Sequence, residues 1–270
     1  VKMGVNVQEG QDVVVNASVH DAYFVEHVVE EAYKAGARHV SVEWSYQPTA
    51  KLAYQYQSVE TLSELPEWTI KKQEYRVEKL PAMIHIVSAD PDGMAGVDQA
   101  KMLQVQRIIG PTMMKYRMAM DNKYQWTIAG IPGKAWAKKI FPDLEVSEAV
   151  EKLWEAILYA SHVSMDNDPV AEWNKLNAEL TKRNEILNDY NFESLHFKNS
   201  LGTDLTIGLV ENHIWAGGGE HSKKGVYFNP NIPTEEVFIS PMKGEAEGIV
   251  YSTKPLCYQG QIIDNFSICI

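Results

Sequence analysis

Hydrophobic runs alternate with helically spaced apolar positions near the start of the chain. Residues 11–18 (QDVVVNAS) form a short valine-rich run, which predicts a buried strand. Asp21 opens a segment whose apolar positions recur at helical spacing, and Gly36 ends that segment as a C-terminal cap. Residues 38–44 (RHVSVEW) predict the next strand. A strand, a helix and a second strand in this order form the unit of a parallel sheet.

The same alternation continues through the first half of the chain. Residues 80–88 (LPAMIHIVS) and 124–132 (YQWTIAGIP) predict two further strands, with a long helical segment between them. Gly110-Pro111 predicts a kink or a break in that segment, because proline removes a backbone donor. The apolar stripe of a following amphipathic helix consists of Val150, Leu153, Trp154, Ile157 and Leu158. We therefore expect residues 1–165 to form a three-layer α/β domain with a mostly parallel sheet.

The pattern changes after Asp168-Pro169, which is a typical helix start with aspartate as N-cap and proline at the first helical position. A polar helix to about Asn188 is predicted there. From Phe192 onward, short β segments are separated by glycine, asparagine and proline. Residues 166–270 are therefore expected to form a linking helix and a β-rich (α+β) segment that is mostly antiparallel.

Composition and charge narrow the classes of partner. The chain has 270 residues, 45% of them hydrophobic, and a formal net charge of -11. This charge argues against nucleic acid or an anionic membrane as the main partner. The two cysteines, Cys257 and Cys269, form no metal-binding or disulfide pattern and suit a reducing compartment. The start of the chain has no signal-peptide core, so a cytoplasmic location is predicted.

Familiar catalytic motifs are absent. The sequence contains no GxGxxG, no GxxxxGK[ST], no HExxH and no GxSxG, which argues against nucleotide binding, a one-helix zinc site and a serine hydrolase. His213 precedes a triple glycine at residues 217–219. We favour a tight hairpin or bulge at these glycines, and the alternative is a close approach of the backbone to a ligand or to another segment.

Two adjacent carboxylates, Glu235 and Glu236, precede an apolar run at residues 237–239 and are flanked by prolines. Successive side chains of a strand point to opposite faces, so at most one of the two carboxylates faces any given pocket. Both are solvated acids at a strand entrance, or one of them is a metal ligand or a catalytic acid. No histidine pair accompanies them, so this stretch supplies a piece of a site at most.

The element NIPTEEVFISP occurs together with LVENHIWAGGGE at residues 209–220 and, near the start, with GVNVQEGQDVVV and AYKAGARHVSVEW. With these segments in this order, the chain resembles the aminopeptidase T, aminopeptidase S and PepS family of co-catalytic metalloaminopeptidases, and the PepS type most of all. The resemblance implies a cytoplasmic homodimer that binds two divalent metal ions, zinc or cobalt. It also implies that the glutamate directly before Val-Phe, Glu236, is the first metal ligand.

The other ligands and the catalytic residues of the family lie downstream of this element and have no counterpart in residues 1–270, so none is assigned. We expect the chain to be a fragment. The resemblance implies an exopeptidase that releases N-terminal residues from peptides with a free N-terminus, using a metal-activated water. This fragment alone is predicted to be inactive. The alternative is a non-catalytic α/β module for binding or dimerisation that is derived from the same fold.

Overall fold

The computed structural model describes all of residues 1–270, and the chain divides into two compact units. The first unit comprises Val1–Met165 and Gly219–Pro233, and the second comprises Asp166–Gly218 and Thr234–Ile270. These units differ in one segment from the predicted domains, 1–165 and 166–270. Residues 219–233 belong to the first unit, although they follow the start of the second in the chain.

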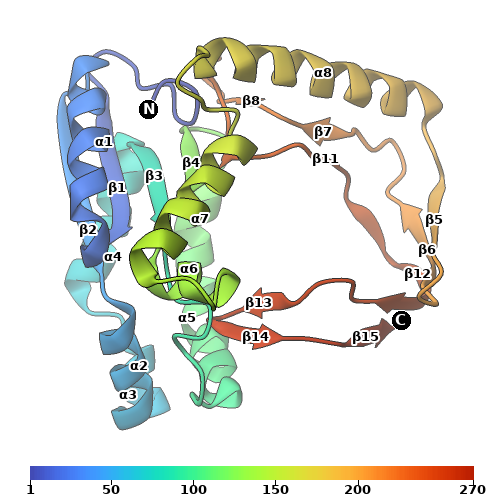
Figure 1. Ribbon diagram of the computed structural model, residues 1–270, viewed down its shortest axis with the longest axis horizontal. Helices are drawn as coiled ribbons and strands as arrows, with labels where there is room; N and C mark the ends of the chain where they lie inside the picture. The colour runs from blue at the N-terminus through green and yellow to red at the C-terminus, as the bar shows by residue number, and fades with distance from the viewer. The chain divides into compact units, whose positions relative to one another are not determined.

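The first unit contains a five-stranded parallel sheet with the order β10-β4-β3-β1-β2 (Figure 1). The strands are β1 (Asp12–Ser18), β2 (His39–Ser45), β3 (Ala82–Val87), β4 (Trp126–Gly130) and β10 (Asn231–Ile232). The first four are the strands predicted from the hydrophobic runs. Because every pair of neighbours in this sheet is parallel, the predicted α/β class with a mostly parallel sheet is confirmed.

Helices connect these strands. They are the 3-10 helix η1 (Val19–Asp21), followed by α1 (Ala22–Lys34), α2 (Gln47–Tyr56), α3 (Val59–Ser63), α4 (Glu67–Lys79), α5 (Gln99–Met120), α6 (Lys134–Ile140) and α7 (Val146–Ala160). A kink or a break was predicted at Gly110-Pro111. Helix α5 runs through Pro111 as one continuous element, so the break does not occur. Its N-terminus is capped by Asp98, whose carboxylate accepts from the amides of Ala100 and Lys101.

The two faces of the first sheet differ in polarity. On β1, Val13 and Val15 have no exposed surface and pack with Val25 and Ala32 of α1 in the main hydrophobic core. The opposite face lies against α4 and is more polar, although Val14 and Met83 are buried there. There, Glu43 of β2 accepts hydrogen bonds from Lys72 at 3.0 Å and from Arg76 at 2.6 Å. Apolar burial therefore attaches α1 to one face of the sheet, and ion pairs contribute to the contact between α4 and the other face.

We expect the substitution Glu43→Gln to destabilise the protein by about 2 kcal/mol at pH 7, because it removes a charge from two partly buried ion pairs. Burial raises the pKa of Glu43, but the hydrogen bonds from Lys72 and Arg76 outweigh it and hold that pKa below the ordinary value. The stabilisation is therefore complete above the ordinary pKa of about 4.3 and is lost as pH falls through the lower folded-state pKa.

Urea denaturation from pH 7 down to pH 3 measures this effect, and the stabilities of the wild type and Glu43→Gln are expected to converge at the acid end. Glu74→Gln is the matched control, since Glu74 forms an exposed ion pair with Lys71 of the same helix. Its effect is expected to stay within about 0.5 kcal/mol. A constant difference between wild type and Glu43→Gln across this pH range would contradict the prediction.

The second unit begins with α8 (Pro169–Tyr190), which Asp168 caps by accepting from the amide of Val170. Its strands are β5 (Ser194–Lys198), β6 (Asp204–Leu209), β7 (Ala216–Gly217), β11 (Val237–Phe238), β12 (Pro241–Tyr251), β13 (Leu256–Tyr258), β14 (Gln261–Ile263) and β15 (Ser267–Cys269). A four-stranded sheet has the order β15-β12-β6-β5, and all its pairs are antiparallel. The expected β-rich segment is therefore present (Figure 1).

Residues 219–233 join the first unit through hydrogen bonds to segments that are distant in sequence. They contain the hairpin strands β8 (Glu220–His221) and β9 (Tyr227–Phe228), followed by β10. Asn229 is fully buried, and its carbonyl accepts from the Thr127 hydroxyl at 2.9 Å. The amide of Ile128 donates to the Pro230 carbonyl at 2.8 Å. These bonds extend the sheet beyond β4, which explains why the segment does not stay with the second unit.

Two further features concern the surface and the cysteines. None of the helices is both long enough and apolar enough to cross a bilayer. Neither Cys257 nor Cys269 forms a disulfide, and both are exposed.

Candidate metal site

The candidate ligand Glu236 directly precedes β11 in the second unit. Strand β11 pairs with β7 in an antiparallel register in which Val237 is opposite Gly217 and Phe238 is opposite Ala216. Helix α8 lies along this pair, and Asn188 of α8 holds the backbone of Trp215, whose amide donates to the Asn188 side chain at 2.7 Å (Figure 1). Asn184 of α8 also donates to the Gly217 carbonyl at 3.3 Å. The position of Glu236 is therefore set by a short strand pair and by two side chains of α8.

The glycine run 217–219 makes this strand pair possible. A side chain at Gly217 would overlap the carbonyl oxygen of Glu236 and would lie 2.9 Å from Cα of Val237. Gly218 has φ +77°, and a side chain there would meet Leu180 of α8 at 3.3 Å. The run forms no tight hairpin, because β7 pairs with β11 and β8 pairs with β9. It allows another segment of the chain to approach its backbone closely, which was the alternative interpretation.

The element TEEVF comprises residues 234–238, and both of its carboxylates, Glu235 and Glu236, are exposed to solvent. Along the strand, Val237 and Ile239 are half-buried, whereas Phe238 is 49% exposed. Glu236 shares a face with Phe238 by the alternation of strand side chains. Its carboxylate is therefore available to a cation or to a partner group from elsewhere, but residues 1–270 do not enclose it.

Residues 1–270 do not fit a complete two-metal centre. They contain no group of three or more histidine, cysteine, aspartate or glutamate side chains placed to hold a metal ion. A pair of bound cations needs several such ligands, so Glu236 would be one member of a larger set. His213 is engaged differently, since its Nδ1 lies 2.9 Å from the Val210 carbonyl and its ring lies edge-on to Trp215.

The structure also contains a hollow that the sequence did not reveal. It has a volume of about 340 Å³ and lies in the first unit, at the edge of the sheet where β1, β3 and β4 begin. Its lining comes from residues around Gln8–Asp12, Arg38, Lys79, Lys123 and the turn at residues 222–226. Because these segments are far apart in the chain, no local motif marks them.

The structure thus combines a parallel α/β unit, a β-rich antiparallel unit and an exposed carboxylate directly before a short strand. The family "Thermophilic metalloprotease (M29)" matches residues 1–270, and the chain belongs to this family. The resemblance inferred from NIPTEEVFISP and its companion segments is thereby confirmed.

Individual relatives agree with the family match. The chain is 41% identical over 269 residues to "Aminopeptidase AmpS" of Bacillus subtilis (strain 168) and 37% identical over 270 residues to "Aminopeptidase PepS" of Streptococcus thermophilus. Each alignment covers 99% of this chain and 65% of the relative. The solved structure "Wild-type AmpT from Thermus thermophilus" superposes with a TM-score of 0.87 at 31% identity. That match covers all of this chain and 66% of the other.

Proposed function

We propose that this chain is the larger part of a metal-dependent aminopeptidase, which releases N-terminal amino acids from peptides. The observation that carries the proposal is the match of a metalloprotease family to every residue from 1 to 270. Support also comes from relatives that bear the name aminopeptidase at 41% and 37% identity. The chain spans 65% of the length of these relatives, so the activity is proposed for the whole protein.

Glu236 is the proposed metal ligand within this chain. It stands directly before Val-Phe in the family element, and its carboxylate is exposed at the start of β11. Carboxylate oxygen is a common ligand of zinc at about 2.0–2.2 Å. The proposed cofactors are two divalent metal ions, zinc or cobalt. No catalytic residue is assigned within residues 1–270, because these residues lack a complete ligand set.

The proposal extends to the setting of the enzyme. The substrates are peptides with a free N-terminus, and the net charge of -11 favours approach of their ammonium groups. A cytoplasmic homodimer is proposed, in which residues 1–165 form the α/β domain and residues 166–270 belong to the catalytic domain. Neither nucleic acid nor a membrane is proposed as a partner.

Metal removal tests the function. Hydrolysis of leucine p-nitroanilide by the full-length protein is expected to fall by about 10²-fold or more after chelation, because metals supply several kcal/mol of transition-state stabilisation. Zinc or cobalt should restore it. The chain of residues 1–270 alone is expected to show no hydrolysis, because it has one proposed ligand. Full-rate, metal-dependent hydrolysis by this chain would refute the assignment of the site.

A second candidate is a non-catalytic binding or dimerisation module derived from the same fold. The observation that favours it is the absence of a metal-binding group of three side chains in residues 1–270. A full-length protein that forms a folded dimer but hydrolyses no peptide with zinc, cobalt or manganese added would support this candidate over the enzyme.

A further inference from the structure

The hollow at the amino edge of the first sheet lies outside the proposed peptidase site. Ligands of parallel α/β sheets usually bind at the carboxyl ends of the strands. This hollow is at the opposite edge, where Asp12 begins β1 and where Lys79 and Leu80 end α4. A volume of about 340 Å³ is in the range of small-ligand sites. The hollow therefore has room for a small molecule.

The charge of the lining is opposite to the charge of the protein. Four cationic side chains line the hollow: Arg38, Lys79, Lys123 and Lys224. Two anionic ones, Glu9 and Asp12, oppose them, which leaves an excess of two positive charges in a chain of net charge -11. Cations gathered in one concavity from four separate segments raise the local concentration of anions.

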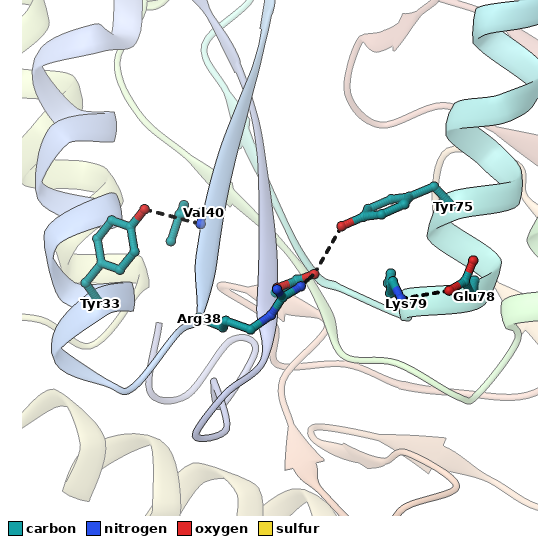
Figure 2. Close-up of polar contacts among 7 residues, drawn as sticks. Tyr33, Arg38, Val40, Tyr75, Glu78 and Lys79 are labelled. Carbon is teal, nitrogen blue, oxygen red and sulfur yellow. Dashed lines mark hydrogen bonds and ion pairs between the residues drawn. The ribbon is translucent and has the colours of Figure 1, made fainter.

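Arg38 is held in place by a buried carboxylate. Its guanidinium donates to Oδ2 of Asp12 at 2.6 Å, and the hydroxyl of Tyr75 donates to the same oxygen at 3.2 Å (Figure 2). The Asp12 side chain is 7% exposed, whereas that of Arg38 is 60% exposed. The second oxygen of Asp12 is buried without a partner. The carboxylate thus fixes one end of the guanidinium and leaves other N–H donors of Arg38 free for a ligand.

Lys79 lies near Arg38 at the end of α4. Figure 2 shows Lys79 at the end of the helix that carries Tyr75. The ammonium group of Lys79 lies 2.7 Å from the carboxylate of Glu78. That exposed pair raises the pKa of Lys79, while the positive charge of Arg38 acts in the opposite direction. An exposed ion pair contributes little, so Glu78 does not prevent Lys79 from binding another anion.

The other two cations have no carboxylate partner. Lys123 donates to the Ala119 carbonyl at 2.7 Å, and Lys224 is exposed. Their segments are joined by a hydrogen bond from the Lys223 amide to the Asn122 carbonyl at 2.6 Å. The turn of residues 222–226 is closed by its own bond from the Ser222 amide to the Val226 carbonyl. Both lysines are therefore held at the rim of one hollow, although about a hundred residues separate them.

We propose that this hollow binds a small molecule carrying a phosphate group, with Arg38, Lys79 and Lys224 as its main contacts. The planar fork of arginine matches the oxygens of phosphate, and the lysines act as point charges around it. This proposal is independent of the peptidase activity, because the hollow lies in the first unit and contains none of the TEEVF residues.

Calorimetric titration of inorganic pyrophosphate tests the proposal. The full-length protein is first dialysed against a chelator, so that no bound metal competes for the probe, and ionic strength is held constant with sodium chloride. Saturable binding of one pyrophosphate per chain is expected. The double variant Lys79→Gln/Lys224→Gln should bind about tenfold more weakly or worse, since it loses two charge-assisted contacts. Arg38→Lys should weaken binding by about fivefold, because the planar fork is lost.

Lys152→Gln is the matched control, since Lys152 is an exposed lysine of α7 that pairs with Glu155 and does not line the hollow. It is expected to leave the affinity unchanged. All these substitutions replace exposed side chains. A midpoint of thermal unfolding equal to that of the wild type would verify that each variant folds. The absence of saturable binding overturns the proposal, as does equal weakening by Lys152→Gln.

Citrate binding as tightly as pyrophosphate would overturn the assignment of a phosphate group. Tighter binding of a nucleoside diphosphate than of pyrophosphate would support it and identify an organic phosphate as the ligand.

Discussion

The substitution Glu236→Gln is expected to lower the proposed aminopeptidase activity of the full-length protein by about 10³-fold, with unchanged thermal stability. Glutamine keeps the size of the side chain, but it replaces one carboxylate oxygen by an NH2 donor and removes the negative charge that favours binding of a cation. The loss corresponds to about 4 kcal/mol of transition-state stabilisation, which is in the range of a metal's contribution. Because Glu236 is exposed, the fold does not depend on its charge. Initial rates with leucine p-nitroanilide and metal content by atomic absorption measure the effect.

Glu235→Gln is the matched control for this substitution. Its carboxylate is adjacent in sequence and is also exposed, but it lies on the other face of the strand. We expect this variant to keep at least about a third of the activity, a change of less than about 0.7 kcal/mol. The reverse pattern, in which Glu235→Gln is inactive and Glu236→Gln is active, would show that the wrong carboxylate has been assigned.

Replacement of Gly217 by alanine is expected to destabilise the second unit by about 3 kcal/mol. The new methyl group would overlap the carbonyl oxygen of Glu236 and meet Cα of Val237 at 2.9 Å. These are backbone atoms, which cannot rotate away as a flexible side chain can, so β7 and β11 have to separate. The midpoint of thermal unfolding should fall by about 10 °C. The loss of activity should be larger than the loss of folded protein alone explains, because the strand next to Glu236 shifts.

Gly130→Ala provides the comparison. A methyl group at Gly130, at the end of β4, would make ordinary contact with the ring of Trp136 at 3.5 Å. Its effect on stability is expected to stay within about 1 kcal/mol. Calorimetry of both variants in parallel measures the difference. If Gly217→Ala unfolded at the wild-type temperature, the close approach of β7 and β11 would not be a requirement of the fold.

The helices of residues 47–79 show where hydrophobic periodicity fails. The sequence pattern predicted none of the three helices α2, α3 and α4. The inward face of α4 carries Lys72 and Arg76, which bind Glu43 of β2, so the helix is joined to the sheet by ion pairs. An apolar stripe reveals a helix only where burial of apolar surface attaches it. The amphipathic α7 has such a stripe, with Leu153 buried, and was predicted.

The candidate metal ligand could be found from the sequence, whereas the hollow at the amino edge of the first sheet could not. Glu236 stands in a contiguous element whose residues are recognisable side by side. Arg38, Lys79 and Lys224 acquire a common role only when separate segments meet at one edge of a sheet. Single cations in a sequence carry no signal of this kind, because most of them are solvated.

The sequence by itself determined the strands β1 to β4, the parallel βαβ start, the capped helix α8 and the family, because each depends on neighbouring residues or on a contiguous motif. Only the tertiary structure decided that residues 219–233 return to the first sheet, that Gly217 lies against the backbone of Glu236 and Val237, and that four cations line one hollow. Those features depend on hydrogen bonds, steric contacts and charges between segments that are far apart in the chain. Local propensity and periodicity carry no information about such distant contacts.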